Sequence, residues 1–240
     1  MRPLARSWDA TRALWRDTAW VFNLGADIYG WFTNQHVWRA SCARMAALLP
    51  EREPLHVADL GCGPGTSAIE LARLRPAAHV VGLDVAGRML RLARRRARAA
   101  GIPPGRLAFT LGDAARLPFG SGCLDVVTGH SFLYQVPDRV GALAEARRVL
   151  RPGGLIVLME PNERPASLRR ATRLGYNPRH LIAVGLWRPF SRIHGRFTRA
   201  SLGATLAEAG FVRCNVRETL GGLGLLATAR SSVHADVRCG

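Results

Sequence analysis

The stretch that decides the fold reads Val57-Ala58-Asp59-Leu60-Gly61-Cys62-Gly63-Pro64-Gly65-Thr66. Its first four residues predict a short buried strand, the glycines predict a tight turn, and Thr66 opens a helical pattern. Glycine lets the backbone approach a ligand closely and take conformations that are closed to other residues. The stretch therefore predicts a strand–turn–helix unit that binds a ligand at its turn.

Short apolar runs alternate with helical patterns after this unit. Continuous apolar runs are typical of parallel strands that are covered on both faces. Strands that alternate with helices imply crossover connections and a doubly wound parallel sheet. Strands are expected at His56–Leu60, His79–Leu83, Leu107–Leu111, Leu124–Thr128 and Leu155–Met159, and helices at Thr66–Leu74, Ala86–Ala100 and Asp138–Leu150.

Both ends of the chain add to this pattern. A helix at Ser201–Ala209 precedes strands at Val212–Arg217 and Gly222–Thr228, which are close enough to pair as an antiparallel edge. Near the N-terminus, apolar residues recur at helical spacing in two places, from Leu4 to Trp15 and from Trp38 to Leu49. The predicted fold class is α/β, with a doubly wound, mostly parallel seven-stranded sheet and an N-terminal helical extension.

The composition excludes several classes of protein. With 240 residues, 48% of them hydrophobic, the chain can bury a core and is not wholly disordered. Its five cysteines form no CxxC pair, so neither a zinc site nor a disulfide framework is expected. Neither a membrane-spanning run nor a secretory signal is predicted. We expect a cytoplasmic protein that binds no metal.

The charge is strongly basic. The chain carries 34 basic residues, all arginine, against 17 acidic ones, for a net charge of +17. A coding bias towards arginine would explain this, and so would an anionic partner such as nucleic acid or a membrane surface. The cluster Arg94-Arg95-Arg96 is not interleaved with aromatic residues, as stacking on bases would require. A nucleic-acid partner is therefore disfavoured, although the charge keeps it open.

Acidic residues at the ends of the predicted strands indicate the kind of ligand. Thr66 stands where the dinucleotide fingerprint G-x-G-x-x-G has its third glycine. Asp59, two residues before the turn, suits a cationic amine and does not suit a pyrophosphate. Asp84 ends the second strand, where an acid can bind both hydroxyls of a ribose. Each acid alone could instead cap a helix.

In this order the motifs resemble the class I S-adenosylmethionine (SAM)-dependent methyltransferases, and most closely the quinone- and biotin-pathway enzymes. The resemblance is close over about residues 55–161 and loose over 200–229. The matching segments are Val57–Thr66, Gly82–Leu90, Gly112–Phe119, Leu124–His130 and Arg148–Pro161. The resemblance implies an N-terminal helical cap at 1–50, a SAM-binding methyltransferase domain at 51–230 with an acceptor-side helical insertion at 162–198, and a tail at 231–240.

The resemblance also implies a role for individual residues. The turn glycines would surround the methionine part of SAM, with Asp59 near its amino group. Asp84 would bind the ribose hydroxyls, Met89 would cover the adenine, and Asp113 would accept a hydrogen bond from the adenine amino group. The expected cofactor-binding residues are Asp59, Gly61, Cys62, Gly63, Gly65, Asp84, Val85, Met89, Gly112, Asp113, Ala114 and His130.

The acceptor chemistry is less strongly indicated. A base is needed only where the acceptor must lose a proton. His130, just after the fourth predicted strand, would face the methyl group and is the first candidate, although it could equally be a polar residue of the cofactor shell. Tyr134 and Glu160 are weaker candidates, and Glu160 could instead cap the next helix. Neither the Asn/Asp-Pro-Pro-aromatic motif of amino-methylating DNA enzymes nor the Pro-Cys nucleophile of cytosine C5 enzymes is present.

Five of the six tryptophans lie in the first 38 residues. They either attach the N-terminal helices to the sheet domain or, with Tyr29, Trp31 and Phe32, line an apolar acceptor pocket. Peripheral membrane contact by this Trp/Arg-rich segment is a further alternative. The basic segment 162–198 could bind a carboxylate or phosphate of the acceptor, or be a solvated lid.

These observations predict methyl transfer from SAM to a small, hydrophobic or lipid-like acceptor by in-line displacement, in which the enzyme chiefly aligns donor and acceptor. Two alternatives remain. The same domain could act on RNA or protein, as the charge would favour, or it could be a SAM-binding regulatory module without transfer activity.

Overall fold

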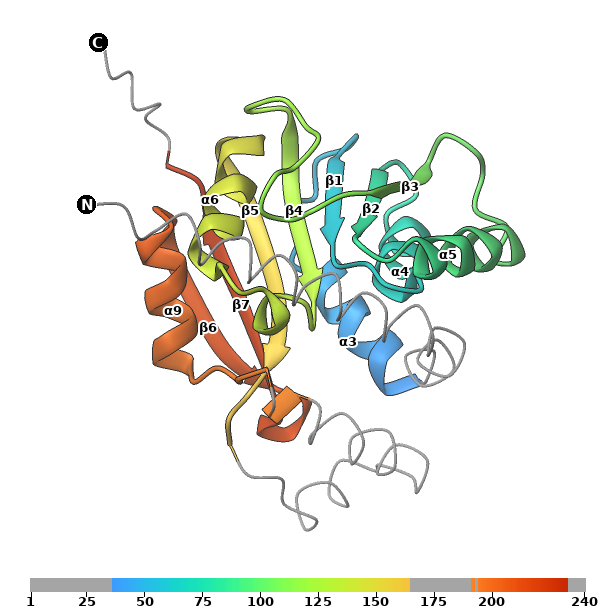
Figure 1. The fold of residues 1–240 in the computed structure, drawn as a ribbon. Coiled ribbons are helices and arrows are strands. Elements are labelled where there is room, and N and C mark those ends of the chain that lie inside the picture. Colours follow the sequence, from blue (N-terminus) through green and yellow to red (C-terminus); the bar gives the residue numbers. More distant parts are fainter. Residues whose placement is uncertain (1–35, 165–190, 193, 233–240) are drawn as a thin grey trace, which may run out of the picture.

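The computed structural model describes residues 36–164, 191–192 and 194–232, which form a seven-stranded sheet with helices on both faces (Figure 1). The strand order is β3-β2-β1-β4-β5-β7-β6. Strands β1 to β5 pair in parallel, and β7 lies antiparallel between β5 and β6. The strands are β1 (His56–Leu60), β2 (His79–Asp84), β3 (Leu107–Leu111), β4 (Leu124–His130), β5 (Leu150–Pro161), β6 (Val212–Thr219) and β7 (Gly224–Arg230). The predicted fold class, including the antiparallel edge, is confirmed.

The helices divide between the two faces of the sheet. Residues of α3, α4 and α5 join one hydrophobic cluster, and residues of α6 and α9 join the other. The elements are α3 (His36–Ala46), α4 (Thr66–Leu74), α5 (Gly87–Ala99), α6 (Arg139–Val149) and α9 (Arg199–Glu208), with short 3-10 helices η1 (Leu133–Gln135) and η2 (Leu220–Gly222). The predicted helices that fall on described residues lie within three residues of these bounds.

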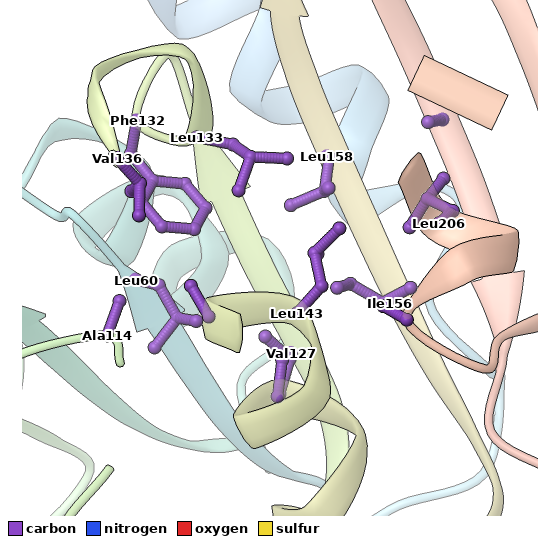
Figure 2. Packing of buried hydrophobic residues seen from close by; sticks show 14 of the residues in the cluster. Leu60, Ala114, Val127, Phe132, Leu133, Val136, Leu143, Ile156, Leu158 and Leu206 are labelled. Carbon is purple, nitrogen blue, oxygen red and sulfur yellow. The ribbon is translucent and has the colours of Figure 1, made fainter. Parts of the chain in front are cut away.

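The central strands contribute side chains to both clusters because successive residues of a strand point to opposite faces. In β4, Val126 belongs to the α3 side and Val127 to the α6 side. Figure 2 shows the second cluster, in which Ile156 and Leu158 of β5 pack near Leu143 of α6. Burial on both faces explains why these strands read as continuous apolar runs.

Local signals explain where the helices begin. Asp138 caps α6 by accepting a hydrogen bond from the Gly141 backbone N–H at 2.8 Å. Thr198 caps α9 through a capping box with Ser201. Helix α5 shows the amphipathic pattern of a surface helix, with Met89 and Leu90 among its buried residues and a stripe of arginines on its outer side, namely Arg88, Arg91, Arg95 and Arg98.

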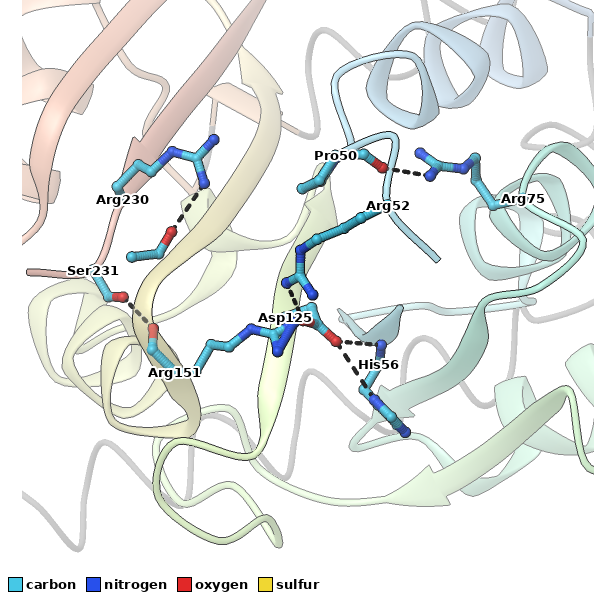
Figure 3. A network of polar contacts seen from close by, with 9 residues as sticks. Pro50, Arg52, His56, Arg75, Asp125, Arg151, Arg230 and Ser231 are labelled. Atoms are coloured by element: carbon cyan, nitrogen blue, oxygen red, sulfur yellow. Dashed lines mark hydrogen bonds and ion pairs between the residues drawn. The ribbon is translucent and has the colours of Figure 1, made fainter. Parts of the chain in front are cut away.

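A polar network closes the end of the sheet opposite the carboxyl ends of the parallel strands (Figure 3). At its centre is Asp125, the buried second residue of β4. Its carboxylate accepts a hydrogen bond from the His56 backbone N–H at 2.8 Å and forms ion pairs with Arg52 and Arg151. The network ties the segment before β1 to β4 and to the start of β5, so we assign it a structural role.

Several predictions fall on parts of the chain outside the described residues. These are the first N-terminal helix with Trp8 and Trp15, the following residues Tyr29, Trp31 and Phe32, most of the segment 162–198, and the tail beyond residue 232. The proposed domain division therefore stays a prediction. In the part of the chain that is described, no helix has the length and hydrophobicity needed to span a membrane.

Candidate active site

The turn after β1 depends on its glycines. Gly61, Gly63 and Gly65 have φ angles of 62°, 51° and 84°, in the left-handed region that favours glycine. There is also no room for a side chain, because a Cβ on Gly65 would lie 2.9 Å from the Cβ of Ala93. The Cys62 backbone N–H donates to the Leu83 carbonyl at 3.0 Å, so the turn is also tied to β2.

Asp84, the last residue of β2, holds the same turn with its side chain. Its Oδ2 accepts from the Gly63 backbone N–H and its Oδ1 from the Ala86 backbone N–H, both at 2.8 Å. Burial raises the pKa of Asp84, and these hydrogen bonds oppose the shift. Because each carboxylate oxygen can accept more than one hydrogen bond, the group can still take hydroxyl donors from a ligand.

Strand order aligns the predicted cofactor residues along one edge of the sheet. Parallel strands end at the same edge, and the order β3-β2-β1-β4 places Asp113, Asp84, the glycine turn and His130 there in sequence. Asp113 is exposed, and its Oδ1 accepts from the Ala115 backbone N–H at 2.9 Å. Gly112 and Val85 are partly exposed, whereas Cys62, Met89 and Ala114 are buried.

Asp59 lies in the interior of the domain, away from solvent. The side chain is fully buried, and its carboxylate accepts hydrogen bonds from the Thr128 hydroxyl at 2.8 Å and from the Ser67 hydroxyl of α4. Burial raises the pKa of Asp59 to about 6, and the two hydroxyls limit the shift. The observed contacts link β1, β4 and α4, and the predicted contact with the amino group of SAM stays a prediction.

His130 ends β4 and lies against α3. Its Nε2 is 2.6 Å from the Ser41 hydroxyl, and the Trp38 ring meets its ring edge to face at 5.6 Å between centroids. Burial lowers the pKa of His130 to about 4, so the imidazole is neutral at physiological pH. A neutral imidazole has one nitrogen that can accept a proton.

The loop after β4 is held by Glu160. The prediction that Glu160 follows the fifth strand is wrong, because β5 extends through Pro161. The carboxylate accepts from the backbone N–H groups of Phe132, Leu133 and Tyr134 at 2.9–3.2 Å. Burial raises the pKa of Glu160 to about 7. With its oxygens directed at three amides, the side chain positions the loop and is a poor candidate for a base.

Ser131 begins this loop in an unfavourable backbone conformation, with a φ of 57°. Its backbone N–H donates to the Met159 carbonyl at 2.6 Å, and its carbonyl accepts from the Gln135 side chain at 3.0 Å. The buried hydroxyl has no hydrogen-bond partner among the described residues. Strained residues and unpaired buried polar atoms both concentrate at functional sites.

Tyr134 and Arg139 connect the loop to the end of the segment 162–198. Tyr134 is buried, and its ring meets the ring of His194 edge to face at 6.2 Å. Arg139 donates to the carbonyls of Tyr134 at 3.0 Å and of His194 at 2.9 Å, and its guanidinium lies 4.6 Å from the centre of the Phe197 ring.

The two ends of that segment also meet each other. The Phe197 backbone N–H donates to the Pro161 carbonyl at 3.1 Å, and the Glu163 N–H donates to the Phe197 carbonyl at 2.8 Å. Both ends therefore lie beside the carboxyl end of β5 and the loop after β4.

Sequence reasoning missed Ser41, Arg139 and the contacts of Glu160. Ser41 and Arg139 stand in ordinary helical patterns, and their partners are 89 and 55 residues away, so no local signal marks them. Glu160 had a weak signal, as an acid in a strongly apolar run before a proline. No group of three metal-ligating side chains is found among the described residues.

The geometry fits SAM. The glycine turn provides a backbone surface without side chains, and Asp84 provides acceptors for ribose hydroxyls. Asp113, just beyond the end of β3, keeps an exposed carboxylate for an adenine amino group. The individual contacts remain predictions.

Comparison with known proteins agrees with this fit. Residues 57–154 match the family model of a methyltransferase domain. The chain is 39% identical over 123 residues to a demethylmenaquinone methyltransferase of Thermus thermophilus, covering 51% of this chain and 53% of the relative. It is 36% identical over 115 residues to a 27-O-demethylrifamycin SV methyltransferase of Amycolatopsis mediterranei, covering 48% and 42%. The chain thus spans about half the length of such relatives.

Solved structures show the same fold. A SAM-dependent methyltransferase from Aquifex aeolicus matches with a TM-score of 0.61 at 16% identity, covering 80% of this chain and 89% of that one. The [4+2]-cyclase SpnF matches with a TM-score of 0.72 at 17% identity, covering 90% and 96%. A cyclase with this architecture shows that the fold alone does not define the reaction. Residues 57–154 are therefore a methyltransferase domain, and its motifs and site geometry are those of the class I SAM-dependent methyltransferases.

Proposed function

We propose that the protein methylates a small, hydrophobic acceptor and that His130 removes a proton from the atom that is methylated. The observation that carries the proposal is the position of the His130 imidazole at the end of β4, beside the glycine turn that follows the neighbouring strand β1. When bound, SAM supplies an electrophilic methyl group. The residues of the chain must align the acceptor and take its proton.

The surroundings of His130 favour an apolar acceptor. Trp38 lies against its ring, and Phe132 and Tyr134 follow it in the loop, all three largely or fully buried. Two of the relatives are named for methylating a demethylmenaquinone and a demethylrifamycin. A comparable acceptor with an acidic carbon or a phenolic hydroxyl would need a base, which His130 can supply.

A labelling experiment tests the substrate class. Purified full chain would be incubated with SAM carrying a labelled methyl group and a host-cell extract, and the products separated into organic-soluble molecules, nucleic acid and protein. Label in the organic fraction is expected, and it would supply material for identifying the acceptor. Label in RNA or protein would overturn the proposed class. Tight SAM binding without label in any fraction would favour a regulatory module.

A His130→Ala variant tests the assigned base. General-base catalysis contributes about 10²–10⁴-fold in rate. We therefore expect kcat to fall by at least about 100-fold while the Kd for SAM changes little. An unaltered kcat in a folded variant would rule out His130 as the base without affecting the substrate class.

A further inference from the structure

Helix α3, which comes before every strand of the sheet in the chain, contacts the ring of His130. Ser41 of α3 lies 89 residues earlier in the chain, and its hydroxyl is 2.6 Å from His130 Nε2. Ser41 is only 1% exposed. Trp38, one turn earlier on the same helix, packs edge to face against the ring. Helix α3 thus supplies both an apolar and a polar contact to the histidine.

The single hydrogen of the Ser41 hydroxyl decides whether Ser41 donates a hydrogen bond to His130 or accepts one from it. A serine hydroxyl has one hydrogen, and Ser41 directs it to the Trp38 carbonyl at 2.7 Å. The hydroxyl oxygen is then left to accept a hydrogen bond from His130. In this arrangement Nε2 carries the hydrogen of the neutral ring, and Nδ1 has the free lone pair.

No side chain of another described residue hydrogen-bonds to Nδ1 of His130. The lone pair of Nδ1 is therefore not taken up by a neighbouring side chain among those residues, as a proton acceptor requires.

We propose that Ser41 is a positioning residue, which holds the Nε2–H of His130 and leaves Nδ1 to accept the proton of the methyl acceptor. This inference rests on the proposed role of His130 as the base. The proton moves from the acceptor atom to Nδ1, and the electron pair left on that atom forms the bond to the methyl carbon as the sulfur–methyl bond breaks with its pair on sulfur. The imidazolium that forms keeps Nε2–H on Ser41 as a charge-assisted hydrogen bond. Helix α3 is therefore part of the acceptor site.

The tautomer can be measured without any activity assay. Long-range ¹H–¹⁵N spectra of the ¹⁵N-histidine-labelled full chain show which ring nitrogen carries hydrogen, and a His130→Asn variant identifies the signals of His130 among the seven histidines. We expect hydrogen on Nε2 in the wild type and a mixture of tautomers in Ser41→Ala. Hydrogen on Nδ1 in the wild type would overturn the inference, because Ser41 would then be the donor.

Kinetics test the consequence for catalysis. Ser41→Ala should lower kcat about tenfold, a part of the general-base contribution, with an unchanged Kd for SAM. Ser41→Thr should restore most of kcat because it keeps the hydroxyl, and the exposed Ser121→Ala serves as the control. Equal loss in the Ala and Thr variants would indicate a packing role and contradict the inference. If the wild type shows the expected tautomer but His130→Ala retains full activity, the base assignment fails and the positioning contact stands.

Discussion

Gly61 and Phe132 meet where β1 and β4 end, and a Cβ on Gly61 would lie 2.4 Å from the Cβ of Phe132. Phe132 is in turn held by Glu160, which accepts its backbone N–H at 3.2 Å. The cofactor turn and the loop after His130 are therefore one packed unit, in which a change on one side displaces the other.

Replacing Gly61 by alanine should damage this unit. An alanine in the left-handed backbone conformation destabilises the folded state by about 1–2 kcal/mol. The collision of its Cβ with Phe132 adds about 1–3 kcal/mol. We expect a lower free energy of unfolding in urea and weaker SAM binding. Gly101→Ala is the matched control, because Gly101 has a similar φ of 69° and nothing within 4 Å of the position that a Cβ would take. Equal losses in both variants would show that backbone strain alone is responsible.

Loss of the Asp84 carboxylate should weaken SAM binding. Hydrogen bonds to a charged group are worth about 1.5–3 kcal/mol, so Asp84→Ala should raise the Kd for SAM by about 10–100-fold, measured by calorimetry. Asp84→Asn keeps an acceptor for the Gly63 or Ala86 amide and should lose less. An unchanged Kd in folded Asp84→Ala would contradict the ribose assignment.

Asp59 should make stability depend on pH. Its folded-state pKa of about 6 lies above the ordinary value of 3.8, so the folded state binds the proton more tightly than the unfolded chain. The stabilising contribution of the protonated acid is complete below about pH 4 and is lost as the pH rises through 6. An asparagine side chain does not titrate in this range. The stability of Asp59→Asn relative to the wild type should therefore increase between about pH 5 and pH 7.5 in urea unfolding, and a decrease would contradict the raised pKa.

Asp125 should affect stability without affecting the cofactor. Removing its buried carboxylate leaves the His56 amide and the Arg52 and Arg151 side chains without their acceptor. Asp125→Ala should lower the free energy of unfolding by about 1–3 kcal/mol, less than for a fully buried pair because both arginines are partly exposed. The Kd for SAM of the folded variant should stay close to that of the wild type, because the network lies at the opposite end of the sheet.

Arg139 should influence the acceptor more than the cofactor. Its guanidinium joins the Tyr134 carbonyl to the His194 carbonyl, and so joins the loop after β4 to the end of the segment 162–198. Arg139→Gln should raise the KM for the acceptor with little change in the Kd for SAM. A comparable rise in the KM for the acceptor and in the Kd for SAM would indicate a general loss of structure.

The fold and the cofactor residues could be predicted because their signals are local. A strand that must be buried on both faces is apolar throughout, as residues 124–130 show, and a turn at positive φ requires glycine at Gly61, Gly63 and Gly65. The positions of Asp84 and Asp113 follow from strand ends that the apolar pattern locates. The error over Glu160 has the same origin, because the apolar pattern marks the interior of β5 well and its end poorly.

The contacts on the acceptor side of the site could not be predicted from local sequence signals. Sequence patterns do not show whether Asp59 faces a ligand or two protein hydroxyls, which nitrogen of His130 is free, or what Glu160 and Arg139 hold. These features depend on partners that are 5 to 89 residues away. Sequence patterns record backbone preference and burial, which each residue expresses locally. Hydrogen-bond partners, tautomers and pKa shifts arise only when packing removes water and brings distant polar groups together.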